Sequence, residues 1–426
     1  MKRTAFLGTI ILFLYMGPSL SAQTVEGASN RGDYLTLKIA VMGPGDELYF
    51  WWGHIALIIE DAATGQSRFF DYGLFSFENE RFFVNFAFGR LLYSCGASPT
   101  ELNLRGYRET NRDITLYTLD LPAETREAVR RFAETNILPE NRDYYYHHFK
   151  NNCVTPILNI IDTATGGQFK AEFGEAPGRY TLRQHVRRHT WFNPFFDWLL
   201  NFLMGQDIDT PITVWEELFL PQELGNRIAD FSYTDASGHE RKLVSSVEVL
   251  NRAVGRPLVL DVPRKQWPQE LLVGIIIAAI LIGLRVLRHK KPDTGRVVWG
   301  SAQALLGLFF GIAGTVLCFM TFFTNHDYTW HNSNILYINP LLLAAVPLGI
   351  MLAVTKNVRK RFMAEQFLKS LWTYVLLGGL LSMAIKLAPG FYQQNQVTQA
   401  LVLPFVLVLS FIPDWVTRRG KKARLD

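Results

Sequence analysis

The chain has 426 residues, is 49% hydrophobic and carries a formal net charge of +5. This length is enough for two or three domains. The apolar residues are concentrated after about residue 267, which excludes a purely soluble chain. The positive charge lies mainly in short segments between apolar runs. That pattern is typical of membrane anchoring and gives no indication of nucleic acid as a partner.

The N-terminus has the pattern of a secretory signal peptide. Lys2 and Arg3 precede an apolar run from Ala5 to Met16, and small residues follow at 19–22. The apolar run is short for a membrane span, so we expect residues 1–22 to be a signal peptide and residues 23–266 to form an exported domain. An uncleaved anchor is the alternative.

Residues 267–413 predict an all-α transmembrane domain of five helices. Each apolar run is long enough to cross the hydrocarbon of a bilayer. The five runs are 271–287, 297–323, 335–355, 370–391 and 397–413.

The distribution of Lys and Arg predicts the orientation of these spans. Basic clusters lie at 288–296, 356–361 and 418–424, whereas the loops 324–334 and 392–396 contain neither residue. Cationic loops remain in the cytoplasm. We therefore expect a multi-pass protein of the bacterial inner membrane, with the exported domain on the periplasmic side and a basic cytoplasmic tail at 414–426.

The exported domain has the pattern of an α+β fold, a small antiparallel sheet with helices packed against it. Helical periodicity is present at 121–137, and a further helix is expected at 154–164. Strands are predicted at 35–42, 54–60, 67–75 and 114–120.

Cys153 and His54 are the candidate catalytic pair. Cys153 precedes the helix 154–164, where unpaired backbone N–H groups and the helix dipole stabilise a thiolate. His54 begins a predicted strand and can take the thiol proton and later return it to a leaving group. Either Asn152 caps this helix, or Thr155 caps it and Pro156 takes the first helical position.

Other residues are candidates for supporting roles. Asp71 and Tyr72, on the returning strand, could orient the imidazole, or they could form an ordinary cross-strand pair. Backbone N–H groups near Asn152 could hold an oxyanion. A disulfide between Cys95 and Cys153 is the structural alternative for the exported cysteines.

Two further regions carry possible functions. The external loop 324–340 is dense in polar groups and could bind substrate through His331, Asn332, Asn334 and Asn339; a solvated connection is the alternative. The aromatic stretches 82–95 and 191–205 suit either the membrane interface or the core, and either could guide an acyl chain. His185 and His189 lack further ligands, so no metal site is predicted, and no cofactor either.

These residues resemble a known family. WWGHIALIIED, FFDYGLFSFEN, FVNFAFGRLLYSC, YYYHHFKNNCVTPI and MGQDIDTPITVWEELFLPQEL are similar to the Lnb N-terminal periplasmic domain family, formerly DUF4105, as is HNSNILYINPLLL before the third span. The order of histidine before cysteine also resembles the circularly permuted NlpC/P60 branch of papain-like thiol enzymes, which includes the lecithin:retinol acyltransferase-like proteins.

The resemblance implies a lipoprotein N-acyltransferase. Such an enzyme moves an acyl chain from phospholipid, through a cysteine thioester, to the α-amine of a diacylglyceryl-cysteine lipoprotein. Cys153 would be the nucleophile and His54 the general base. The alternatives are a peptidoglycan amidase or endopeptidase with the same dyad, and a non-catalytic membrane scaffold.

Overall fold

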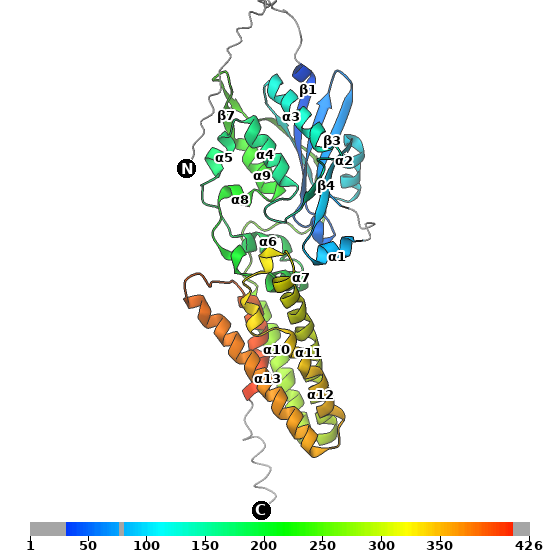
Figure 1. The fold of residues 1–426 in the computed structure, drawn as a ribbon, viewed down its shortest axis with the longest axis vertical. Coiled ribbons are helices and arrows are strands. Elements are labelled where there is room, and N and C mark those ends of the chain that lie inside the picture. Colours follow the sequence, from blue (N-terminus) through cyan, green and yellow to red (C-terminus); the bar gives the residue numbers. More distant parts are fainter. Residues whose placement is uncertain (1–30, 76–80, 412–426) are drawn as a thin grey trace, which may run out of the picture.

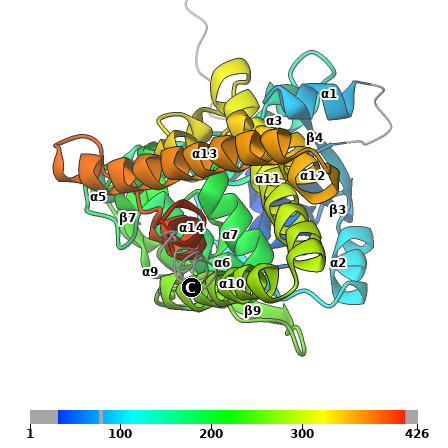
Figure 2. The ribbon, with the colours of Figure 1, turned by 90° about the horizontal axis from the view of Figure 1, so that it is seen from below.

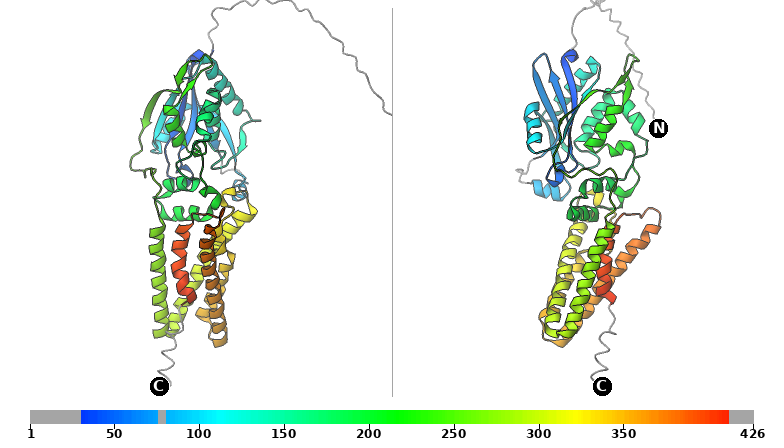
Figure 3. Two further views of the ribbon diagram at one scale, coloured as in Figure 1. Left: turned by 90° about the vertical axis from the view of Figure 1, so that its left-hand side faces the viewer. Right: turned by 180° about the vertical axis from the view of Figure 1, so that it is seen from behind.

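The computed structural model describes residues 31–75 and 81–411. The molecule is elongated, with an α/β domain at one end of the long axis and a bundle of apolar helices at the other (Figure 1). The two further views in Figure 3 show the same division. The expected signal peptide and the basic tail lie outside the described residues.

A seven-stranded antiparallel sheet forms the centre of the α/β domain. The central strands contain buried apolar residues on both faces because helices cover both sides of the sheet. The strand order is β6 (Asp143–Tyr145), β4 (Leu92–Pro99), β3 (Gln66–Leu74), β2 (His54–Asp61), β1 (Leu35–Met42), β5 (Ile114–Leu119) and β9 (Val244–Asn251).

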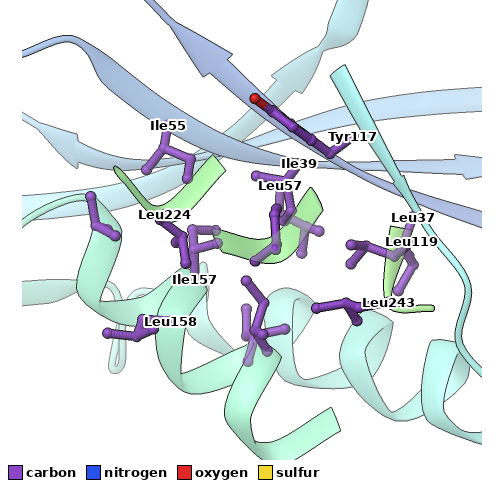
Figure 4. Close-up of a cluster of buried hydrophobic side chains, with 14 of the residues drawn as sticks. Leu37, Ile39, Ile55, Leu57, Tyr117, Leu119, Ile157, Leu158, Leu224 and Leu243 are labelled. Atoms are coloured by element: carbon purple, nitrogen blue, oxygen red, sulfur yellow. The ribbon is translucent and has the colours of Figure 1, made fainter. Parts of the chain in front are cut away.

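Three helices cover one face of this sheet, α3 (Ala123–Asn136), α4 (Val154–Ala164) and α9 (Pro221–Asp230), and α2 (Thr100–Glu109) packs on the other. Figure 4 shows the core of the first face, where Ile39 and Leu57 of the sheet meet Ile157 of α4 and Leu224 of α9. Smaller elements complete the domain: α5 (Gln168–Phe173), α8 (Val214–Glu217), β7 (Ser232–Thr234) and β8 (Glu240–Lys242).

A layer of two helices, α6 (Leu182–Thr190) and α7 (Pro194–Leu203), joins the α/β domain to the bundle. The Arg183 side chain is fully buried in this layer, where its Nε donates to Asp209 over 2.7 Å. In α7, Trp198 and Phe202 are buried against the bundle. The aromatic stretch 191–205 is therefore mainly a packed junction between the two domains.

The bundle contains α10 (Trp267–Lys290), α11 (Pro292–Phe323), α12 (Ala345–Val354), α13 (Val358–Ala384) and α14 (Gln396–Phe411). Within the described residues, four helical segments are long and apolar enough to cross a membrane. They are α10, α11, Ser333–Val354 and Val358–Leu387. The fifth helix, α14, is apolar but shorter and packs beside α10 and α13, as the view along the bundle shows (Figure 2).

The strands and helices predicted for the exported domain are confirmed, with ends shifted by at most two residues. The basic segment 358–361 lies inside α13, whereas the sequence pattern placed it in a loop. The ambiguous stretch 82–95 divides into a short helix, α1 (Phe82–Ala87), and the start of β4. The helix exposes Phe83 and Phe86, whereas Tyr93 and Cys95 of β4 are buried, so the stretch contains both surface and core positions.

Candidate active site

His54 and Asp71 lie on neighbouring strands at the membrane end of the sheet. Asp71 pairs in register with Ala56, two residues beyond His54, so both side chains leave the same face. The His54 Nε2–H donates to Asp71 Oδ1 over 2.7 Å. This bond fixes the ring and leaves Nδ1 as the nitrogen available to another group.

The electrostatic environment favours the charged form of His54. Burial acts to lower the pKa of the imidazole, but Tyr107, the Asp71 carboxylate and Cys153 together raise that pKa well above its ordinary value. The Tyr107 ring of α2 stacks on the imidazole with the centroids 6.3 Å apart. An imidazolium held in this way can donate a proton to a leaving group.

Cys153 occupies the N-cap of α4, with φ −60° and ψ −24°, and is buried. The helix therefore starts one residue after the sulfur, and the residues 153–156 present the positive end of its dipole beside the thiol. Neither expected alternative holds, because Thr155 lies inside α4 and Asn152 precedes the N-cap residue.

Gly73 brings the cysteine and the histidine together. It lies at a break in the β3–β4 register and has φ +103°. A Cβ atom at this position would lie 3.6 Å from the Cβ of Cys153 and 3.9 Å from the Cε1 of His54. The His54 side chain projects from the face of the sheet that α2 covers, and Cys153 lies on the face that α4 covers. Because Gly73 has no side chain, the two residues can approach each other between these faces.

Asn152 holds the loop before α4 in place. Its side-chain amide donates to the carbonyls of His148 and Phe219, and its Oδ1 accepts the backbone N–H of Val154. Its own backbone N–H donates to Thr155 Oγ1 over 3.1 Å. Asn152 thus positions the nucleophile, and its backbone and side-chain N–H groups already donate hydrogen bonds within the protein.

Tyr72 lies apart from this arrangement. Its ring is in the core on the α4 side of the sheet, and its hydroxyl accepts a hydrogen bond from Asn136 Nδ2 over 3.3 Å. Successive residues of a strand point to opposite faces, so Tyr72 and Asp71 cannot both reach the imidazole. Of the two residues expected to orient His54, the structure places only Asp71 against it.

Three tyrosines that the sequence analysis missed surround the thiol and the imidazole. Tyr107 stacks on His54, and Tyr146 lies 3.9 Å from the Cβ position of Gly73. Tyr144 has a buried hydroxyl with no hydrogen-bond partner among the described residues. Burial is the largest cause that raises the pKa of Tyr144, and the nearby Cys153 is the second. The run Tyr144–Tyr146 just before Cys153 was a usable signal, whereas nothing local distinguished Tyr107.

The residues expected to bind substrate in the loop 324–340 have hydrogen-bond partners within the protein. Asn332 and Asn334 are buried and donate to backbone carbonyls of α7, and Asn339 donates to Ile335 and Tyr374. Asn332 and Asn334 therefore stabilise the junction of the domains, whereas the hydrogen bonds of Asn339 lie within the helical bundle. His331, with φ +50°, bonds to Asp207 at the surface.

Another part of this loop contacts the segment that leads to the nucleophile. His147 Nε2 donates to Asp327 over 2.7 Å, and Lys150 Nζ bonds to the same carboxylate over 2.6 Å. The hydrogen bond from His147 is the largest cause that lowers the pKa of Asp327. The ring of Tyr328 packs against Phe149. The bundle therefore directly supports residues 147–150.

The cysteines and histidines show no sign of a disulfide or a metal centre. Cys95, Cys153 and Cys318 are free thiols, and Cys95 Sγ donates to the carbonyl of Asn136 over 3.0 Å. Within 31–75 and 81–411, no group of three or more His, Cys, Asp or Glu side chains could hold a metal ion. His185 bonds to Glu217, and His189 donates to the carbonyl of His185.

The fold and this site define a class of protein: an α/β domain with buried polar groups at one end, carried on a helical domain with four candidate membrane spans among the described residues. Residues 24–188 match the Lnb N-terminal periplasmic domain, and residues 265–413 match the Lnb transmembrane domain. The chain therefore belongs to the Lnb family, which is associated with lipoprotein processing at the membrane. No curated protein and no solved structure matched the chain.

Proposed function

We propose that the protein is a lipoprotein N-acyltransferase that uses Cys153 as its nucleophile. The observation that carries the proposal is the meeting of Cys153 with the His54–Asp71 pair at Gly73, at the membrane end of the periplasmic domain. A buried thiol beside a histidine held by a carboxylate is suited to acyl transfer through a thioester. This end of the domain is the one nearer the bilayer, where both lipid substrates would reside.

In the first half-reaction the Cys153 thiolate attacks the ester carbonyl of a phospholipid. The backbone N–H of Cys153 and the Tyr144 hydroxyl stabilise the oxyanion. The bond between the carbonyl carbon and the glycerol oxygen then breaks, His54 donates a proton to that oxygen, and a lysophospholipid leaves. The acyl chain remains on Cys153 as a thioester.

In the second half-reaction the α-amine of a diacylglyceryl-cysteine attacks the thioester. His54 accepts the proton of the amine, the carbon–sulfur bond breaks and the thiolate is released. The product is an N-acylated lipoprotein. Asp71 keeps the imidazole oriented through both steps. The chemistry needs no cofactor.

We propose the domain limits and the fold relation on the same basis. Residues 1–22 form the signal peptide, 23–266 the periplasmic enzyme domain, 267–413 a transmembrane domain of five helices and 414–426 a cytoplasmic tail. The histidine on a strand, preceding a cysteine at the start of a helix packed on an antiparallel sheet, supports a permuted NlpC/P60-like, papain-type domain.

Mass spectrometry of lipoprotein N-termini tests the function directly. The wild type and Cys153→Ser are expressed in a bacterial host that lacks its own N-acyltransferase. We expect N-acylated termini with the wild type and free amines with Cys153→Ser. Free amines with both proteins, at equal membrane levels, would contradict acyl transfer and favour the peptidoglycan amidase, whose activity on cell-wall fragments is then assayed.

A further inference from the structure

Helix α1 presents apolar side chains outward at the membrane end of the periplasmic domain. Val84 is 57% exposed, and Phe86 and Phe88 are 45% and 37% exposed. Viewed along the long axis, α1 lies beyond the outline of the helical bundle (Figure 2). Val84 and Phe88 are four residues apart and lie on the same side of the helix, and Phe86 is exposed on another side. Exposed apolar residues grouped in this way mark a site of interaction.

Contacts with α11 place this face at the surface of the bilayer. The Phe88 ring lies 5.5 Å from the ring of Phe319, and the Phe88 carbonyl accepts the N–H of Asn325 over 2.9 Å. The last turn of α11 exposes Phe322 and Phe323 beside these contacts. Since α11 is a candidate span that ends here, α1 lies level with the point at which the chain leaves the hydrocarbon.

A row of aromatic rings leads from α1 to the nucleophile. Phe82 of α1 stacks on Phe75 with the centroids 5.8 Å apart, and Phe75 lies 5.1 Å from Tyr93. Tyr93 stacks on Tyr146 at 4.3 Å, and Tyr146 lies against the Gly73 gap beside Cys153. The row is apolar or aromatic along its whole length, as an acyl chain requires.

We propose that α1 and this aromatic row bind an acyl chain of a membrane phospholipid and bring its ester bond to Cys153. The proposal deepens the proposed function and depends on it. The ester bonds of a phospholipid lie at the interface, level with α1. The guanidinium of Arg90 lies 5.9 Å from the Phe88 ring, where a basic group can meet the lipid phosphate. The occupant is therefore the acyl donor.

A charge introduced on α1 tests this proposed route of the acyl chain from α1 along the aromatic row to Cys153. Val84→Asp and the control Leu102→Asp each place one carboxylate at an exposed apolar position of a helix, and Leu102 follows the far end of β4, away from the bundle. The full-length protein is reconstituted in phosphatidylethanolamine–phosphatidylglycerol vesicles without acceptor. Cys153 thioester is measured by mass spectrometry, with the vesicle lipid and with a monomeric short-chain ester as donors.

For Val84→Asp we expect the ratio of the vesicle rate to the soluble-ester rate to fall about tenfold, as expected for the loss of one apolar side chain from a lipid contact. The ratio for Leu102→Asp should equal that of the wild type. An unchanged ratio for Val84→Asp would overturn the route. An acceptor lipoprotein is then added to the same vesicles. If Val84→Asp forms the thioester at the wild-type rate but fails to transfer the acyl chain, the proposal is also overturned, because α1 would then serve the acceptor.

A second measurement needs no substitution on α1. Cys153→Ser protein is reconstituted with a phospholipid that carries a photoactivatable group in its acyl chain, and the labelled peptides are mapped. We expect labels on residues 82–93 and on Tyr146. Labels confined to the transmembrane helices would overturn the route. If the wild type forms no thioester with the vesicle lipid or with the short-chain ester, the result would instead contradict the proposed function itself.

Discussion

At the scale of single residues, the site depends on a glycine as much as on the catalytic side chains. Gly73 has a positive φ, and any side chain there would meet Cys153 and His54. Gly65 also has a positive φ, of +70°, but a Cβ there would meet nothing within 4 Å. Substitutions at these two glycines therefore distinguish the effect of backbone strain from the effect of obstructing the site.

We predict that Gly73→Ala and Gly65→Ala each destabilise the domain by roughly 1 kcal/mol, the cost of placing a Cβ in a left-handed backbone conformation. Only Gly73→Ala should also lower thioester formation, by more than tenfold. Thermal unfolding in detergent and the thioester assay measure the two effects. Equal activities for the two variants would show that the gap has no role.

The carboxylate of Asp71 raises the pKa of His54, which gives a prediction for pH dependence. Protonation of the leaving lysolipid needs the imidazolium, so the rate of thioester formation falls as the pH rises through the pKa of His54. Asp71→Asn removes one of the effects that raise this pKa. We expect the descending limb of the pH–rate profile to move to lower pH and the maximal rate to fall roughly 100-fold or more.

The control for Asp71 is Glu60→Gln, which removes a carboxylate from the next strand where it pairs with Lys38. Its pH profile should match that of the wild type. A profile for Asp71→Asn that keeps its descending limb in place would contradict the role of Asp71 in holding the charged imidazole.

Tyr144 provides a third test at this scale. Its buried hydroxyl lacks a partner in the described parts of the chain, so it is free to donate to an oxyanion. We expect Tyr144→Phe to lower kcat for acyl transfer roughly 100-fold, as the loss of one oxyanion donor does in other hydrolytic sites. Tyr145→Phe, at a neighbouring residue that is 68% exposed, is the matched control. Equal kcat values would exclude Tyr144 as a donor.

At the scale of elements, the loop between α11 and α12 supports the segment that carries the nucleophile. Asp327 bonds to both His147 and Lys150, whereas Asp207 holds His331 of the same loop at the surface. Both are aspartate–histidine pairs, but only the first contacts the segment before Cys153. The loop therefore connects the bundle to the geometry of the active site.

We predict that Asp327→Asn increases amide hydrogen exchange over residues 143–152 and lowers acyl transfer several-fold, because the pairs with His147 and Lys150 lose the charged acceptor. Asp207→Asn should change neither quantity. Hydrogen exchange of the reconstituted protein, followed by mass spectrometry, measures the first effect. Identical exchange in the two variants would contradict the supporting role of the loop.

At the scale of the whole molecule, the basic clusters predict the orientation of the bundle. Because Lys and Arg are retained in the cytoplasm, the C-terminus should lie inside the cell and the α/β domain outside. A fluorescent protein fused after Asp426 should fluoresce, and alkaline phosphatase fused there should be inactive. An active phosphatase fusion would require an even number of spans and would leave α14, with its 16 residues, on the surface of the membrane.

The sequence by itself determined the elements whose pattern is local. The alternation in β1 and the uninterrupted apolar run in β2 indicated strands, and the apolar runs after residue 267 indicated the spans. Cys153 and His54 were candidates because the chemistry of a helix N-terminus and of an imidazole can be read from residue type and position.

Only the tertiary structure decided which residues meet. The register of β2 and β3 selected Asp71 over Tyr72 as the partner of His54, because adjacent residues of a strand face opposite sides of the sheet. Packing also assigned Asn332 and Asn334 to the domain junction and brought Tyr107 onto the imidazole. Such contacts join residues far apart in the chain, and their partners are set by register and packing rather than by local composition.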